Sequence, residues 1–263
     1  MALTSERREN PENALSTFYD KLAPDYDLMT GFEKRFVREK PFFRLLVDRY
    51  RIRTALDAGC GTGFHSLLLA QLGVEVTAID VSERMLERLA VHANEMKLIM
   101  KLVRSSFQDL PAKVDEKFDA VFSLGNSLAH LLSNAELSRA LSNFFLLLKP
   151  GGMLFIQNLN YDRILTGKER IQSVNEQDGV TFVRFYDYLD DRIIFNILKL
   201  QLTTEGMEHE LNTVELRPLV KSELVQYLSQ AGFREIQPYG EISMEEFDPQ
   251  TSKDLVLLAS KSQ

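Results

Sequence analysis

A glycine-rich loop follows an aspartate near the start of the chain, and a second aspartate ends the next apolar segment. The first stretch contains Asp57, Gly59, Gly61 and Gly63 in alternating positions, and Asp80 closes the segment VEVTAID. Glycines at this spacing permit a tight turn and let a ligand approach the backbone. A carboxylate at the end of a second strand typically bonds a ribose diol. Together these features predict a site for a nucleoside-containing cofactor.

The spacing of the glycines distinguishes a dinucleotide cofactor from a cofactor that carries an ammonium and a sulfonium. The dinucleotide pattern Gly-x-Gly-x-x-Gly needs a third glycine at position 64, which is Phe64 here. The third glycine is Gly63 instead, and Asp57 places a carboxylate just before the loop. A pyrophosphate disfavours a nearby carboxylate, whereas a ligand with an ammonium and a sulfonium tolerates it. The loop therefore favours the cationic ligand.

Composition sets the broad class of the protein. The chain has 263 residues, of which 44% are hydrophobic and 26% charged, as in one large globular domain or one domain with an elaboration. No apolar run reaches about 18 residues, so no transmembrane helix is expected, and the polar N-terminus lacks a signal-peptide core. The single cysteine, Cys60, fits a reducing compartment. We therefore expect a cytoplasmic protein.

The net charge and the spacing of the histidines limit the classes of ligand that the chain is expected to bind. The formal net charge is −7 and no lysine- or arginine-rich stripe stands out, which argues against a nucleic-acid partner. The histidines have no spacing typical of metal ligands, so no metal is expected; they are His65, His92, His130 and His209. A small molecule remains as the expected partner, with neither nucleic acid nor membrane.

The elements that must position this loop alternate along the chain. The segments TALDAG, VEVTAID, IMKLVRS, KFDAVFSLG and MLFIQNLN are strand-like, and helical segments separate most of them. Ser82 is a candidate N-cap, and Ser133 with Glu136 forms a candidate capping box. Such alternation predicts an α/β fold with a doubly wound parallel sheet. Ligands of this fold bind at the carboxyl ends of the strands.

The flanking segments predict further elements. Residues 1–12 have the composition of a disordered segment, and Pro41 predicts a break or a fresh start in the helical stretch at residues 34–50. VTFVRFYDYLDD, RIIFNILKLQLTTEG and MEHELNTVELRP predict three antiparallel strands. VKSELVQYLSQAGF predicts a helix that Ser222 caps and Gly232 ends, and REIQPYG and KDLVLLAS supply two last strands.

These elements predict four regions. Residues 1–50 form an N-terminal helical lid, and residues 51–160 form a cofactor-binding Rossmann-like core. Residues 161–217 form an antiparallel β insertion for the acceptor or for oligomer contacts, and residues 218–263 complete the core sheet. Because subunits often meet at such insertions, the sequence leaves a homo-oligomer open.

LDAGCGTG with VTAID resembles the class I S-adenosylmethionine-dependent methyltransferases, whose pattern is D-x-G-x-G-x-G with an acid closing the second strand. SLGNSLAHL and NYDRILTG are similar to segments of glycine N-methyltransferase and related small-molecule N-methyltransferases. The resemblance implies a seven-stranded sheet with an antiparallel last strand and a small antiparallel insertion after strand five. It also implies S-adenosyl-L-methionine as cofactor and S-adenosyl-L-homocysteine as product.

The resemblance also implies the residues that bind the cofactor, which lie at strand ends and in the N-terminal helices. They are Tyr19, Tyr26, Arg35, Asp57, Gly59, Cys60, Gly61, Gly63, Asp80, Val81, Met85, Ser106, Phe107, Gln108, Leu124, Gly125 and Ser127. Arg35 suits a clamp on the cofactor carboxylate, or belongs to a solvated helix face. Tyr19 and Tyr26 cover the cofactor or pack as aromatic core. Phe107 stacks on adenine, whose amino group is left to Ser106, Gln108 or the backbone.

Asn126 and His130 are the catalytic candidates. By the resemblance Asn126 reaches toward the acceptor, although asparagine also caps turns, and His130 is either a site residue or a packing residue. Glycine N-methyltransferases carry an arginine for the amino-acid carboxylate where this chain has Leu159. Leucine cannot pair a carboxylate, so glycine or sarcosine as acceptor requires a replacement from Arg163, Arg170 or Arg184.

The leading hypothesis is methyl transfer from S-adenosylmethionine to a small molecule, with an amine nitrogen favoured, by in-line displacement. An amine needs only to arrive neutral, whereas a hydroxyl needs a base, for which His130, Tyr161 and Tyr186 are candidates. FVRFYDY, residues 182–188, forms the acceptor pocket if it faces the cleft and core if it does not. The alternatives are a non-catalytic S-adenosylmethionine-binding regulator and a nicotinamide-dependent oxidoreductase.

Overall fold

The computed structural model describes residues 11–262. Disorder was expected at residues 1–12. Residues 1–10 lie outside the described range, and residues 11 and 12 are helical. Pro11 begins the first helix, α1, which runs Pro11–Leu22. Within the described residues no helix is long and apolar enough to cross a membrane.

A seven-stranded sheet forms the core, in the order β10-β11-β5-β4-β1-β2-β3. Its strands are β1 (Thr54–Ala58), β2 (Glu75–Asp80), β3 (Lys101–Arg104), β4 (Phe118–Ser123), β5 (Leu148–Leu159), β10 (Arg234–Tyr239) and β11 (Asp254–Ser260). β11 runs antiparallel to both of its neighbours, while the pairs from β5 to β3 are parallel. The predicted doubly wound methyltransferase-type sheet with an antiparallel last strand is confirmed.

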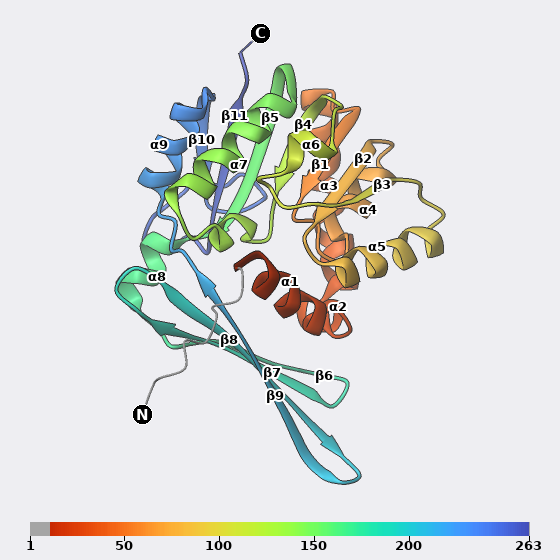
Figure 1. Ribbon diagram of the computed structural model, residues 1–263, viewed down its shortest axis with the longest axis vertical. Coiled ribbons are helices and arrows are strands. Elements are labelled where there is room, and N and C mark those ends of the chain that lie inside the picture. The colour runs from red at the N-terminus through yellow and green to blue at the C-terminus, as the bar shows by residue number, and fades with distance from the viewer. Residues whose placement is uncertain (1–10, 263) are drawn as a thin grey trace, which may run out of the picture.

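Helices cover both faces of this sheet (Figure 1). One side carries α3 (Phe32–Tyr50), α4 (Phe64–Gln71) and α5 (Glu83–Glu95), and the other carries α6 (Leu110–Lys113), α7 (Asn134–Leu147) and α9 (Lys221–Ala231). Neighbouring strand residues go to opposite sides, so that Ala55 and Phe122 pack with the first set while Leu56 and Val121 pack with the second. The central strands β4 and β11 are largely apolar because both of their faces are buried, whereas the edge strands β3 and β10 are exposed or only partly buried.

Most of the predicted helix ends are confirmed. The Ser82 hydroxyl accepts a hydrogen bond from the Met85 amide, and Ser133 forms the predicted capping box with Glu136. The Ser222 prediction is wrong, because α9 begins at Lys221 and no side chain of its own N-cap residue bonds the helix. A carboxylate from another element satisfies the first turn instead, since the Lys221 amide donates to Asp162 Oδ2 at 3.0 Å.

The break predicted at Pro41 is also wrong. α3 runs through Pro41 without interruption. Phe36 on one side of the proline and Phe43 on the other pack against the same core cluster. This shared burial holds both halves on one axis, although proline removes one helical hydrogen bond.

A second, separate sheet follows β5, as predicted, and a short helix, α8 (Tyr161–Gly167), leads into it. It is antiparallel, with β6 (Ile171–Gln177), β7 (Val180–Tyr188), β8 (Ile193–Thr203) and β9 (Gly206–Leu216) in sequence order. Three strands were expected and four are present. The sequence did not indicate β6 because it is an edge strand whose residues are mostly exposed.

The N-terminal helices lie between the two sheets (Figure 1). α1 is followed by α2 (Tyr26–Thr30), with turns at Pro24 and Gly31 as predicted. Phe18, Leu22 and Met29 pack against Phe182 and Ile197 of the second sheet. This packing sets the helices over the carboxyl ends of the core strands.

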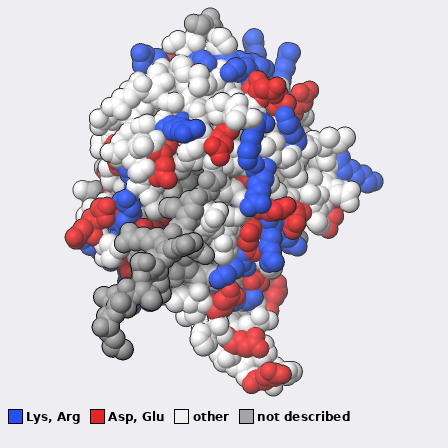
Figure 2. Space-filling view, viewed as in Figure 1, with Lys and Arg blue, Asp and Glu red and all other residues white. Residues whose placement is uncertain are grey.

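Charged side chains of both signs are interspersed over the face seen in Figure 2. Acidic side chains gather at the lower tip, where Figure 1 places the turn between β8 and β9. No continuous basic area covers the described part of this face.

Candidate active site

A cavity of about 1180 Å³ opens at the carboxyl ends of the core strands. Its walls come from the loops after β1, β2, β3 and β4, from α1 and from strands β8 and β9 of the second sheet. The turn after β4 contributes a 3₁₀ helix, η1 (Ser127–His130). The cavity therefore lies at the edge where an α/β sheet binds its ligands.

Most of the predicted site residues line this cavity. They are Tyr19, Tyr26, Arg35, Gly59, Cys60, Gly61, Asp80, Val81, Ser106, Phe107, Gln108, Leu124, Gly125, Ser127 and His130. These residues come from segments as far apart in the sequence as Tyr19 and His130, and the fold brings them together around one cavity. Four predicted residues are not brought there.

Asp57 and Gly63 support the loop from behind. Asp57 is 1% exposed, and the Ser66 hydroxyl donates to its Oδ2 at 2.6 Å. Burial raises the pKa of this carboxyl above its ordinary value. Gly63 has φ +90°, and a Cβ there would lie 1.9 Å from Cδ1 of Leu89 on α5. The third glycine is therefore required by the close approach of α5.

Asn126 and Met85 also turn away from the cavity. Asn126 Nδ2 donates to the Tyr161 hydroxyl at 2.9 Å, and its Oδ1 accepts from the Leu159 amide at 3.1 Å. Both ends of the amide are thus bonded inside the protein, and they tie the turn after β4 to the end of β5. Met85 is fully buried and packs in the cluster that contains Phe18.

The glycine loop is fixed to β2 by hydrogen bonds. The amides of Gly59 and Cys60 both donate to the Ile79 carbonyl at 2.9 Å. The Gly61 amide donates to Asp80 Oδ2 at 2.9 Å, and the Ser82 amide donates to Asp80 Oδ1 at the same distance. Burial raises the pKa of Asp80 to about 6, against the opposing effect of these two amides.

A side chain at position 59 would fill part of the cavity wall. A Cβ on Gly59 would lie 2.7 Å from Ser127 Oγ and 3.2 Å from Cζ of Phe107. The loop thus lies directly against η1 and against the ring of Phe107, which the sequence predicted to stack on adenine. The close approach of the loop to Ser127 and Phe107 therefore requires a glycine at position 59.

Tyr19 and His130 meet inside the cavity. Tyr19 Oη and His130 Nε2 are joined by a hydrogen bond of 2.7 Å, and Nδ1 of His130 is buried without a partner among the described residues. Burial lowers the pKa of His130 to about 4. Burial also raises the pKa of Tyr19. The pair is therefore uncharged at neutral pH.

Arg35 lines the cavity near the glycine loop. Its Nε donates to Glu39 Oε1 at 3.1 Å, and its guanidinium carbon lies 4.3 Å from the centre of the Phe64 ring. Of the three arginines proposed to replace the missing one, none lines the cavity. Arg170 pairs with Asp187, and Arg184 donates to the Met29 carbonyl.

Sequence reasoning missed part of the wall. The missed residues are Ala14, Leu15, Thr30, Thr62, Phe64, His65, Ser105, Leu131, Leu132, Glu136, Ile194, Thr213, Val214 and Glu215. The insertion does face the cavity, but through β8 and β9. In FVRFYDY, Phe182 and Tyr186 are buried in apolar clusters, so the core interpretation of that strand holds. Tyr161 is fully buried too.

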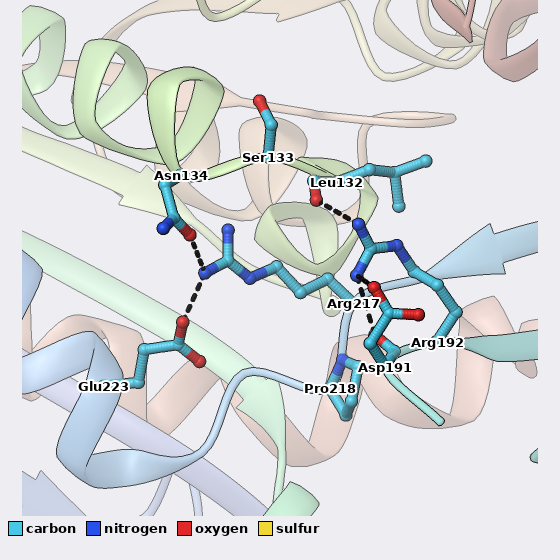
Figure 3. Close-up of a pocket in the computed structure, with 8 residues that line it drawn as sticks. All are labelled: Leu132, Ser133, Asn134, Asp191, Arg192, Arg217, Pro218 and Glu223. Carbon is cyan, nitrogen blue, oxygen red and sulfur yellow. Dashed lines mark hydrogen bonds and ion pairs between the residues drawn. The ribbon is translucent and has the colours of Figure 1, made fainter. Parts of the chain in front are cut away.

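A second, smaller cavity of about 450 Å³ lies where the second sheet joins the core (Figure 3). Arg217 Nη2 donates to Asn134 Oδ1 at 2.6 Å and also pairs with Glu223. Arg192 donates to the Leu132 carbonyl at 2.6 Å. These bonds connect the second sheet to α7 and α9, and we assign the cluster a structural role.

The geometry of the main cavity agrees with what the chain resembles. The sequence family described as a methyltransferase domain matches residues 55–152. An S-adenosylmethionine-dependent methyltransferase from Clostridium acetobutylicum superposes with a TM-score of 0.80 at 18% identity, covering 93% of this chain and 99% of its own. The chain is an S-adenosylmethionine-dependent methyltransferase, with S-adenosylmethionine as methyl donor.

Similar proteins of known activity indicate which methyltransferases this chain is related to. The glycine/sarcosine N-methyltransferase of Aphanothece halophytica is 29% identical over 216 residues, which cover 82% of this chain and 79% of the relative. The enzyme of the same description from Parasynechococcus marenigrum is 25% identical over 240 residues, or 89% of this chain and 83% of the relative. The chain is thus homologous to glycine/sarcosine N-methyltransferases. Neither the nicotinamide-dependent oxidoreductase nor the non-catalytic regulator is supported by these matches.

Proposed function

We propose that the protein transfers a methyl group from S-adenosylmethionine to the amine nitrogen of a small molecule. The observation that carries the proposal is one continuous cavity with the glycine loop and Asp80 in one part and the Tyr19–His130 pair in another. At about 1180 Å³ it exceeds the usual size of a site for one small ligand. It therefore has room for the cofactor and an acceptor together.

The residues present fit the cofactor. The backbone of Gly59 and Gly61 lines the cavity together with Ser127 and Phe107, so that part of the wall offers backbone, a hydroxyl and an aromatic ring to a ligand. We assign Asp80 to the ribose hydroxyls, because its carboxylate lines the cavity and is held by two backbone amides. We assign Phe107 to the adenine ring and Arg35 to the cofactor carboxylate, which a guanidinium suits.

When bound, S-adenosylmethionine supplies a methyl group on a sulfonium sulfur, which keeps the electron pair of the breaking carbon–sulfur bond as the new nitrogen–carbon bond forms. The protein has little covalent chemistry to perform, so alignment and exclusion of water are its main contributions. α1 and the second sheet supply these walls on the acceptor side.

We assign His130 an orienting role. A group whose pKa is about 4 is a weak base at neutral pH. His130 instead holds the Tyr19 hydroxyl through the 2.7 Å hydrogen bond. An uncharged pair also suits an acceptor that must enter as a neutral amine. We assign Asn126 a supporting role through Tyr161 and the Leu159 amide.

The test has two stages with the whole chain. The first is thermal unfolding with S-adenosylmethionine, S-adenosylhomocysteine or NAD, where a ligand at about 100 times its dissociation constant adds about 2.7 kcal/mol. The second is transfer of a labelled methyl group to a panel of amines and alcohols, with products identified by mass spectrometry. We expect stabilisation by the two sulfur nucleosides and methylation of an amine. Methylation of alcohols alone would overturn the proposal.

A further inference from the structure

Two carboxylates flank the η1 turn that carries His130. Glu215 lies on β9, and Glu136 lies in the first turn of α7, which follows η1 closely. Both line the cavity. The Arg217 amide donates to the Ala129 carbonyl at 2.7 Å, which fixes the end of β9 against η1. Glu215 is therefore held on the acceptor side of the cavity.

Neighbouring acidic side chains are paired, whereas these two retain free oxygens. Asp187 pairs with Arg170, Asp191 with Arg192, Glu223 with Arg217, and Asp25 with Lys199. Glu215 has no hydrogen bond or ion pair to any described residue. Glu136 uses Oε2 in its capping box, and its Oε1 has no partner in that part of the chain.

Positive charge is scarce on the same wall. Among the side chains that the structure describes, Arg35 is the one lysine or arginine that lines the cavity, and it lies beside the glycine loop with its Nε bonded to Glu39. An acceptor carboxylate would meet Glu215 without a cation to balance it, which is unfavourable. A second ammonium on the acceptor would instead gain a charge-assisted hydrogen bond.

Apolar side chains, here called the apolar strip, line the cavity together with the Tyr19–His130 pair and Glu215. Leu15 of α1, Leu131 and Leu132 after η1, and Ile194 and Val214 of the second sheet line the same cavity. Ile194 lies directly opposite Glu215 in the register of β8 and β9. Such a strip suits methylene groups between two nitrogens.

From this arrangement we infer that the acceptor is a small aliphatic amine that carries a second, protonated nitrogen and no carboxylate. Glu215, with help from Glu136, binds the protonated nitrogen. The inference rests on the proposed amine methylation and names the substrate class of that same site. The reacting nitrogen is the neutral one, and the distal ammonium keeps its charge.

The experiment compares acceptors of similar length that differ at the distal end. Putrescine ends in an ammonium, n-butylamine in a methyl group and γ-aminobutyrate in a carboxylate, and glycine is added as the substrate named for the relatives. We expect kcat/KM to fall in the order putrescine, n-butylamine, γ-aminobutyrate, with glycine also a poor acceptor. A preference for γ-aminobutyrate or glycine would overturn the inference but leave amine methylation intact.

Two variants assign the effect to the carboxylates. Glu215→Gln removes the charge at an exposed position, and Glu136→Gln preserves the capping box because glutamine also forms it. We expect Glu215→Gln to raise KM for putrescine about threefold, within the range of an exposed ion pair, and to leave KM for n-butylamine unchanged. Glu205→Gln, in the turn between β8 and β9 and outside the cavity, is the charge-matched control.

The outcomes are distinguishable. An unchanged putrescine KM in both cavity variants would overturn the assignment of the carboxylates. If the protein methylates other amines of the wider panel but none of these four, the inference fails and the proposed function stands; if it methylates alcohols alone, both fail.

Discussion

The cofactor part and the acceptor part of the cavity are built in different ways. The cofactor part is mainly backbone, with the Gly59–Gly63 loop fixed to β2 and to Asp80 by amide hydrogen bonds. We assign to the acceptor part the side chains of α1, β8 and β9 that line the cavity, together with His130 at the end of η1. A change in the first should therefore affect folding or cofactor affinity, whereas a change in the second should affect the acceptor.

The largest effect is expected at Gly63. Gly63→Ala adds a Cβ 1.9 Å from Leu89 at φ +90°, so strain and overpacking combine. We expect the free energy of unfolding to fall by about 3 kcal/mol, measured by denaturant titration. Gly73→Ala is the matched control, because φ is +86° but no atom lies within 4 Å. It should lose only about 1 kcal/mol, and equal losses would refute the close-packing argument.

Asp80 should dominate cofactor affinity. Asp80→Asn keeps the size of the side chain, but its NH2 group must face one of the two amides that donate to Asp80. We expect calorimetry to show about 100-fold weaker binding of S-adenosylmethionine, or about 2.7 kcal/mol. Asp190→Asn, which is exposed and outside the cavity, controls for net charge. Equal affinities of the two variants would remove Asp80 from the cofactor part.

The titration of Asp80 gives a pH test. Its folded-state pKa is raised to about 6, so the folded state holds a proton that the unfolded state releases between about pH 4 and pH 6. The contribution of this group to the unfolding free energy therefore falls as pH rises through that window. Wild type should show this decline relative to Asp80→Asn. Affinity for the cofactor should change in the opposite sense and weaken as pH falls below about 6, because protonation removes the charged acceptor.

His130 tests the acceptor part. His130→Gln removes the ring that holds the Tyr19 hydroxyl. We expect kcat to fall about tenfold, with cofactor affinity unchanged. The pH profile of kcat decides between orientation and base catalysis, because a base role would show a wild-type titration that the variant lacks. We expect profiles of the same shape near neutral pH.

The smallest effect is expected at Ile194. Ile194→Ala shortens the apolar strip opposite Glu215. We expect KM for the acceptor to rise about threefold, from lost apolar contact, without a change in cofactor affinity. Val174→Ala, at an exposed position of β6, is the control. Weaker cofactor binding in Ile194→Ala would show that the two parts are not separable.

The same division explains what the sequence could predict. Gly59, Gly61 and Asp80 lie close together along the chain, and their spacing alone indicates the loop, the strand end and the kind of ligand. The alternation of strands and helices likewise predicts the core sheet, because each element is an apolar segment with recognisable ends.

The acceptor part depends on long-range placement that spacing does not encode. Ile194 and Glu215 reach the cavity because β8 and β9 pair in one register and the second sheet then packs against α1. Glu136 was recognised as a capping residue, but it also lines a cavity that only the tertiary fold creates. Asn126 resembles a site residue in sequence, yet the fold places Tyr161 within hydrogen-bonding distance of it.

α1 joins the two parts. Ser16 bonds the Val81 carbonyl, Asp20 accepts from the Ser82 hydroxyl, and Tyr19 bonds His130. The helix thus forms a wall of the chamber, held there by these polar contacts and by the apolar packing of Phe18 and Leu22. A movement of α1 away from the cavity would break the Tyr19–His130 hydrogen bond, to which we assign the orienting role in the reaction. Opening the chamber and separating Tyr19 from His130 are consequently a single event. The proposed reactive geometry therefore exists only while the chamber is closed to ligand entry and release.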